Sequence, residues 1–92
     1  MQPAPMTLNE LRISLRAILD LEQAADVDWK RAAAQCRQIR SRLQQQGAPD
    51  YTDEFVAVFL DDAELRRADH EYAEVQHQRL KNWLEGAEIL AR

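Results

Sequence analysis

Two histidines and a glutamate lie at metal-ligand spacing in the C-terminal half of the chain. His70, Glu74 and His77 stand at positions i, i+4 and i+7, so a helix would carry all three on one face. Glu74 and His77 also have the Glu-x-x-His spacing of di-iron and di-manganese helical bundles. Such a site needs a second motif, and one copy would complete it only in a symmetric homodimer. The solvated side of a long helix explains the same residues, and we expect no metal and no cofactor.

The single cysteine, Cys36, is the next group that could react. It lies between Ala32 and Ile39 on a predicted apolar helical stripe, where a thiol packs as a small hydrophobic group. A nucleophilic cysteine needs a histidine or a helix N-terminus beside it, and neither is near in sequence. Paired acids such as Asp61 and Asp62 are typical of helix starts, where the helix dipole stabilises them. These patterns predict a protein that is not an enzyme.

Composition excludes several further classes of function. The 92 residues make at most one domain, and two glycines leave nothing for a phosphate-binding loop. One cysteine excludes an intramolecular disulfide and a multi-thiolate metal site. No apolar run approaches the roughly 18 residues of a membrane span. Residues 1–6 lack the basic and apolar regions of a signal peptide, so we predict a cytoplasmic protein that does not bind membranes.

The elements that must position these residues are helices. Ala, Leu, Gln, Glu and Arg, which favour helix, dominate the sequence. We predict an all-α fold, a small antiparallel bundle of three long helices, in which a break in the third would give four. Residues 1–6 are predicted to form a flexible N-terminal arm because Pro3 and Pro5 supply no amide donor. Residues 7–92 are predicted to form a single helical domain.

Capping signals and periodicity place the first two helices. Thr7 and Glu10 form a capping box that predicts a helix over 8–25. A helix over 28–46 should start at Asp28 and stop before Gly47. Along both segments a stripe of mostly apolar residues recurs every three or four positions. These stripes are Leu8, Leu11, Leu15, Ile18 and Glu22 in the first helix, and Trp29, Ala32, Ala33, Cys36, Ile39 and Leu43 in the second.

The rest of the chain allows two interpretations. Either one helix runs over 52–85, or the chain breaks near Asp61, which we favour because two consecutive aspartates are poor helix interior. The apolar stripe of the last helix would comprise Leu65, Ala68, Tyr72, Val75, Leu80, Trp83 and Leu84. The step of five from Val75 to Leu80 predicts contact with more than one neighbour. Such a helix would overhang a compact bundle and end near Gly86.

Charge is strongly segregated along the chain, although its formal total is only -4. Acids outnumber bases in residues 1–26 and again in residues 48–92. Residues 27–47 instead carry five bases against a single acid, Asp28. One basic helix is therefore embedded in an acidic protein.

Three interpretations of this basic helix stay open. Its charges could pair internally with the acidic last helix, meet another protein, or contact nucleic acid. The acidic total and the lack of a basic arm make nucleic acid the weakest of these. We predict a non-catalytic protein-interaction module or regulator that docks through a helix face, with nucleic-acid binding and a metal-binding dimer as alternatives. The predicted contact residues are Lys30, Arg31, Arg37 and Arg40, and separately the apolar end Leu80, Trp83 and Leu84, which a partner or a second copy in a homodimer would cover.

Overall fold

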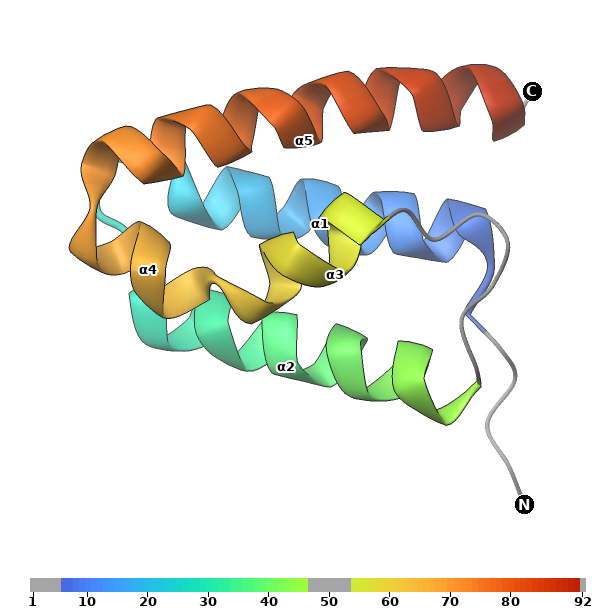
Figure 1. Cartoon of the computed structure of the whole chain (residues 1–92), viewed down its shortest axis with the longest axis horizontal. Coiled ribbons are helices and arrows are strands. Elements are labelled where there is room, and N and C mark those ends of the chain that lie inside the picture. The colour runs from blue at the N-terminus through green and yellow to red at the C-terminus, as the bar shows by residue number, and fades with distance from the viewer. Residues whose placement is uncertain (1–5, 47–53, 92) are drawn as a thin grey trace.

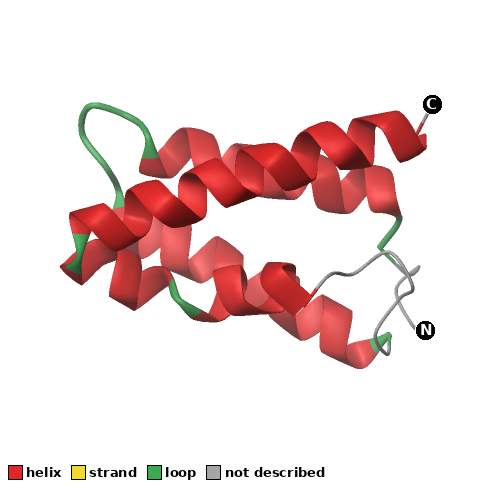
Figure 2. Cartoon of the chain, turned by 45° about the horizontal axis from the view of Figure 1, so that its top comes forward, coloured by secondary structure: helices red, strands yellow, loops and turns green. Residues whose placement is uncertain are grey.

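All the regular structure in the described part of the chain is helical. The computed structural model describes residues 6–46 and 54–91, the last four of these by backbone alone. Its helices are α1 (Leu8–Glu22), α2 (Trp29–Gln45), α3 (Glu54–Asp61), α4 (Ala63–Ala68) and α5 (His70–Ala91). Figure 2 shows helices with loops and turns between them, and no strand among the described residues. The all-α fold class is confirmed.

The helices form an antiparallel bundle with four legs: α1, α2 and α5 are one leg each, and α3 and α4 together are the fourth. Figure 1 shows α1 and the α3–α4 pair running one way, and α2 and α5 running back. Helix α1 packs against α2 and α5, while α2 packs against α3 and α4, and α5 closes the ring by contacting α4 and α3. The expected bundle of three long helices therefore needs correction. The long helices are α1, α2 and α5, and the two short helices together make the remaining leg.

Two aspartates break the C-terminal half of the chain. The break predicted near Asp61 occurs at Asp62, which precedes α4 with φ of -101° and ψ of 16°. A second, unpredicted break occurs at Asp69, whose backbone is extended, with φ of -131° and ψ of 105°. Its Oδ1 accepts the Tyr72 N–H at 3.1 Å, as a helix N-cap does. The chain reverses there, so the alternative of one helix over 52–85 is wrong.

The predicted caps of the first two helices are confirmed, although their ends shift slightly. Thr7 Oγ1 accepts the Glu10 N–H and Asp28 Oδ1 accepts the Arg31 N–H, both at 3.1 Å. Helix α1 ends at Glu22 instead of residue 25, and α2 ends at Gln45. The predicted stop signal Gly47 lies outside the described residues.

The last residue of the predicted N-terminal arm, Met6, packs against the bundle. Met6 is buried in the core, with 2% of its surface exposed. Its N–H donates to Gln46 Oε1 at 2.6 Å, and its carbonyl accepts from Gln46 Nε2, which joins the start of α1 to the end of α2. Residues 1–5 lie outside the described part of the chain.

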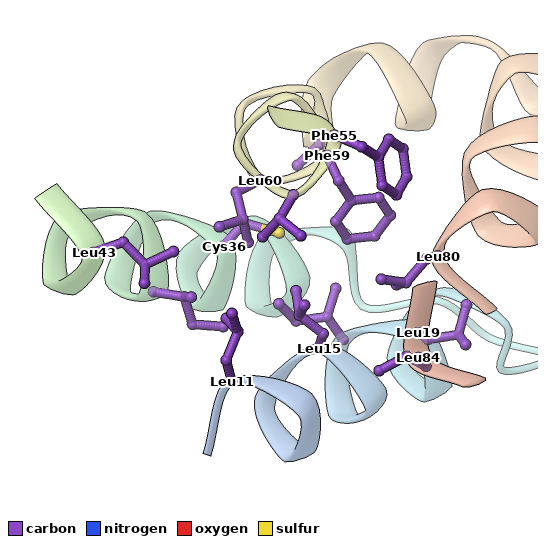
Figure 3. Packing of buried hydrophobic residues seen from close by; sticks show 14 of the residues in the cluster. Leu11, Leu15, Leu19, Cys36, Leu43, Phe55, Phe59, Leu60, Leu80 and Leu84 are labelled. Carbon is purple, nitrogen blue, oxygen red and sulfur yellow. The ribbon is translucent and has the colours of Figure 1, made fainter. Parts of the chain in front are cut away.

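One hydrophobic core lies between the legs, and Figure 3 shows side chains from α1, α2, α3 and α5 meeting in it. The largest apolar side chains that are fully buried in it are Phe59, Leu11, Leu15, Ile18, Leu19, Leu80, Leu84 and Val56. The predicted stripe of the last helix was wrong at Leu65 and Val75, which are more than half exposed, and at Ala68, which is also exposed. The buried face of α5 comprises Ala73, Gln76, His77, Leu80, Leu84 and Ala87. No helix in the described ranges has both the length and the apolar character to cross a membrane.

Helix α5 continues through Gly86, which we expected to end it. A Cβ placed on this residue would meet nothing within 4 Å. Glycine is disfavoured in a helix because it loses more backbone freedom on folding than alanine does. Gly86→Ala should therefore raise the free energy of unfolding by about 0.5–1 kcal/mol, measured by urea denaturation followed by circular dichroism. A decrease would show that the end of α5 is not helical in solution.

Candidate functional site

The structure separates the three residues predicted as weak metal ligands. His70 Nε2 lies 3.0 Å from Glu74 Oε1, and both side chains are exposed on the surface of α5. His77 turns inward, and its Nε2 lies 2.9 Å from Oε1 of Glu22 on α1. Within the described ranges, no three His, Cys, Asp or Glu side chains come together in a way that could hold a metal ion. Our expectation that His77 lies off the core was wrong, since it occupies a core position of α5.

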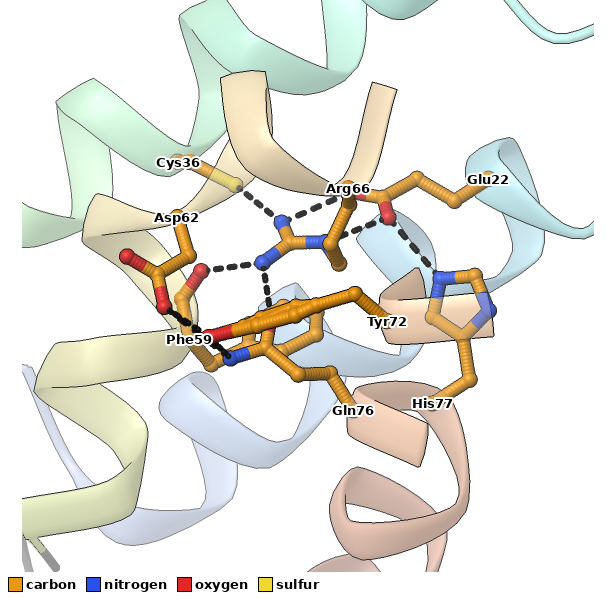
Figure 4. Close-up of polar contacts among 8 residues, drawn as sticks. All are labelled: Glu22, Cys36, Phe59, Asp62, Arg66, Tyr72, Gln76 and His77. Atoms are coloured by element: carbon orange, nitrogen blue, oxygen red, sulfur yellow. Dashed lines mark hydrogen bonds and ion pairs between the residues drawn. The ribbon is translucent and has the colours of Figure 1, made fainter. Parts of the chain in front are cut away.

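The partner of His77 belongs to a buried polar network centred on Arg66 of α4, which Figure 4 shows. Arg66 is fully buried, and its guanidinium forms a bidentate ion pair with Glu22, with Nε–Oε1 of 2.7 Å and Nη2–Oε2 of 2.9 Å. Nη1 donates to the Phe59 carbonyl and, at 2.8 Å, to Gln76 Oε1. Nη2 also reaches Cys36 Sγ at 3.7 Å. All five N–H groups of the guanidinium thus have acceptors.

An aromatic ring completes the surroundings of Arg66. The Cζ atom lies 3.8 Å from the centroid of the Phe59 ring, within the range of a cation–π contact. Phe59 therefore offers the same guanidinium both its carbonyl and its ring face. A buried charge is costly unless it is paired and hydrogen-bonded. Because every N–H group of the Arg66 guanidinium has an acceptor, this arginine of α4 can be buried in the core.

The network extends to the surface through Gln76. Gln76 Nε2 donates to Tyr72 Oη at 2.9 Å and to Asp62 Oδ2 at 3.1 Å, and the Tyr72 hydroxyl donates to the same carboxylate. The hydrogen bond to Asp62 raises the pKa of Tyr72. Tyr72 and Asp62 stand on either side of the Asp69 break, so this contact holds α4 and α5 together at the turn.

Electrostatics in the network keep Glu22 ionised. Burial alone would raise the pKa of Glu22, but hydrogen bonds from His77 and Arg66 and the charge of Arg66 outweigh it. Glu22 therefore has a pKa below its usual value. The thiol behaves differently, because burial raises the pKa of Cys36 to about 11. Cys36 is thus a buried, protonated thiol, which agrees with the expected structural role.

The network borders a cavity at the end of the bundle, where α1, α4 and the start of α5 meet. It has a volume of about 510 Å³. Glu22, Arg66 and His77 line its inner part, and His70, Glu74 and Arg67 also line it. The remaining lining is largely apolar: Ala24, Ala25, Val27, Trp29 and Ala73, together with Gln23. We call this the end cavity.

The predicted basic residues lie on an open face of α2. Lys30, Arg31 and Arg37 are exposed, and Arg40 is partly exposed. Arg40 pairs with Asp61 of α3, with Nε–Oδ1 of 3.1 Å, and Arg42 lies 3.5 Å from Glu10 of α1. These ion pairs of α2 reach α1 and α3. The expected pairing with the acidic last helix does not account for the charge of this face.

A groove runs beside this basic face, between α2 and the α3–α4 leg. It has a volume of about 270 Å³ and is lined by Ala33, Arg37, Arg40, Ser41, Gln44, Leu60, Asp61, Ala63 and Glu64. A neighbouring hollow of about 430 Å³ also includes Ala33, Arg37 and Glu64 and extends to Lys30 and Trp29. We call the first of these the α2 groove. Arg37 and Arg40 border it on α2, and the acids of α3 and α4 lie opposite.

The predicted apolar end of the last helix is not an open surface. Leu80 and Leu84 are buried in the core, with 0% and 1% of their surface exposed. Trp83 is partly buried and packs against the same core. The expectation of an overhanging apolar patch was wrong for Leu80 and Leu84, because α5 lies alongside α1 instead of extending past the bundle.

Comparisons of the chain with known protein families, with curated proteins and with solved structures found no match.

Proposed function

We propose that the chain is a non-catalytic protein-interaction module that binds an acidic helical segment of a partner protein along α2. The observation that carries this proposal is the basic face of α2 beside the α2 groove. Lys30, Arg31 and Arg37 have no ion pair within the described residues, in a chain whose formal charge is -4. Positive charge concentrated on one face of an acidic protein attracts an acidic partner and orients it.

The α2 groove offers the partner an apolar contact between two rows of opposite charge. Leu60 and Ala63 lie at its base, buried except for a few per cent of their surface. An amphipathic helix docks by placing apolar side chains into such a groove at i, i+3 and i+4 spacing. Acids on its flank would then meet Lys30 and Arg37. Ala33, the alanine of α2 that lines the groove, is small enough for this helix to approach closely.

A displayed library of amphipathic helical peptides, panned against the purified full chain, tests this proposal. Recovered peptides should be enriched in acids on one flank of the apolar stripe. A representative peptide should bind the Lys30→Glu/Arg37→Glu variant at least tenfold more weakly in fluorescence anisotropy. Binding should also weaken with added salt, because exposed charges are screened.

The matched control is Arg16→Glu/Lys81→Glu, which changes the net charge equally but on α1 and α5. This variant should retain peptide affinity within about twofold. Equal loss in both variants, or enrichment of uncharged peptides, would contradict the proposal. Duplex DNA that binds more tightly than the peptide would instead favour nucleic acid. A dimer in light scattering that Lys30→Glu/Arg37→Glu dissociates would identify a second copy as the occupant.

A further inference from the structure

We infer that the end cavity binds a small organic carboxylate, whose carboxylate group meets the imidazole of His77. This inference is independent of docking along α2. The cavity volume of about 510 Å³ is within the range of small-molecule sites. A buried ion pair and a nearly buried histidine line it, and such clusters of ionisable groups in a cleft are candidates for functional sites.

His77 is the member of the polar network with capacity left for a ligand. Both oxygens of Glu22 accept hydrogen bonds, and the five donors of Arg66 are occupied. Nε2 of His77 faces the ionised Glu22, so this nitrogen carries a proton. Nδ1 has no hydrogen-bond partner in the part of the chain that the structure describes. The side chain retains 9% of its surface exposed, and the residue lines the end cavity.

A carboxylate bound at Nδ1 of His77 completes a series of alternating charges. Arg66 is positive and Glu22 is negative, and the bidentate contact holds them together. With a proton on each nitrogen, His77 is positive and donates through Nδ1 to the ligand, which supplies the final negative charge. Each charge then has opposite neighbours, which offsets the cost of removing the ligand from water.

The other charged groups around the cavity favour a monoanion. Arg67 of α4 supplies a positive charge, and Glu74 of α5 supplies a negative one that His70 partners. With Arg66 and Glu22 included, the two arginines balance the two glutamates. Protonation of His77 therefore leaves one positive charge, which matches one carboxylate.

The apolar walls indicate the rest of the ligand. The side chains of Ala24, Ala25, Val27 and Ala73 line the cavity without polar atoms, and the Trp29 ring lies among them. Small side chains leave room, and an indole offers a face to an aromatic or aliphatic group. A compact apolar body that carries one carboxylate fits this lining.

Titration with benzoate, followed by NMR of the histidine rings, tests the inference on the full chain. At pH 6, benzoate should saturate a single site and shift the His77 ring signals, whereas benzyl alcohol of similar size should bind at least tenfold more weakly.

Two variants keep this test decisive. His77→Gln retains a donor to Glu22 but cannot become positive, so benzoate binding should be lost. If that variant fails to fold, Trp29→Leu leaves the network intact and should weaken benzoate at least fivefold. Val75→Gln, exposed on the same helix and outside the cavity, should bind as the unchanged chain does. Unshifted His77 signals at saturating benzoate, or equal binding of benzyl alcohol, would overturn the inference.

Discussion

Arg66→Met should lower the free energy of unfolding by about 3–5 kcal/mol, because it leaves the Glu22 carboxylate buried without its main cation. Glu22 then retains only His77 as a partner, Gln76 Oε1 loses its donor from Arg66, and the Phe59 carbonyl keeps only the Asp62 N–H at 3.3 Å. Buried acceptors without partners each add to the loss. Since small domains are stable by only about 5–15 kcal/mol, the variant should be near the limit of folding. Urea denaturation followed by circular dichroism measures the change.

The neighbouring arginine supplies the control. Arg67 is exposed and makes only a 3.9 Å contact with Glu64, so Arg67→Met should change stability by less than about 0.5 kcal/mol. The double variant Arg66→Met/Glu22→Leu should be more stable than Arg66→Met alone, because it removes the orphaned charge as well. An Arg66→Met chain with an unchanged urea midpoint would show that the buried ion pair does not form.

Phe59→Ala should also cost about 3–5 kcal/mol, since it removes a fully buried aromatic side chain and leaves a cavity. The Phe59 ring makes two contacts, one with another aromatic ring and one with a cation. Its centroid is 6.0 Å from that of Phe55, with a tilt of 55° between the rings, and it faces the Arg66 guanidinium. The alanine variant therefore loses apolar burial and exposes one side of the network. Thermal and urea denaturation of the purified variant measure the loss.

Phe59→Leu separates these two effects. Leucine retains much of the apolar volume but has no ring to face the guanidinium, so this variant reports the cation–π contact. For a desolvated pair we expect a loss of about 2 kcal/mol. In Phe59→Leu/Arg66→Met the two losses should not add, because both changes remove the same contact. A Phe59→Leu chain as stable as the original would show that the ring contributes only its volume.

Local signals in the sequence were sufficient to predict the helical class and most helix starts. Thr7 and Asp28 act as predicted because a side-chain oxygen can satisfy an N–H only three residues ahead. The break at Asp62 followed from the poor helix propensity of consecutive aspartates. The reversal at Asp69 was missed because a single aspartate inside a helical pattern is common. Only the docking of α5 back onto α1 and α4 makes a break there favourable.

The polar network could not be predicted from periodicity alone. Glu22 was visible as an acid on the apolar stripe of α1, but nothing in the sequence connects it to Arg66, 44 positions later. The irregular step from Val75 to Leu80 was the second signal. Polar residues at Gln76 and His77 fill the core positions between the apolar ones, so the true stripe is regular. A stripe interrupted by groups that hydrogen-bond one another looks irregular when only apolar residues are counted.

The sequence was more informative about the basic face than about the apolar end. Lys30, Arg31 and Arg37 are exposed because they stand opposite the Ala32–Cys36–Ile39 stripe on the same helix. Trp83 was placed on an overhang that required a three-helix bundle. In the four-legged arrangement its neighbours Leu80 and Leu84 are core residues, so the proposed contacts now rest on α2 alone.

The position of Arg66 affects how cooperatively the chain unfolds. Its guanidinium, carried by α4, contacts acceptors on α1, α2, α3 and α5, so every helix contributes to one cluster. If any one helix detaches, a buried polar group loses its partner while the others remain desolvated. Partly opened forms are therefore penalised relative to the fully folded and the fully unfolded chain. A helix of six residues, too short to persist alone, thereby makes the unfolding of all five a single cooperative transition.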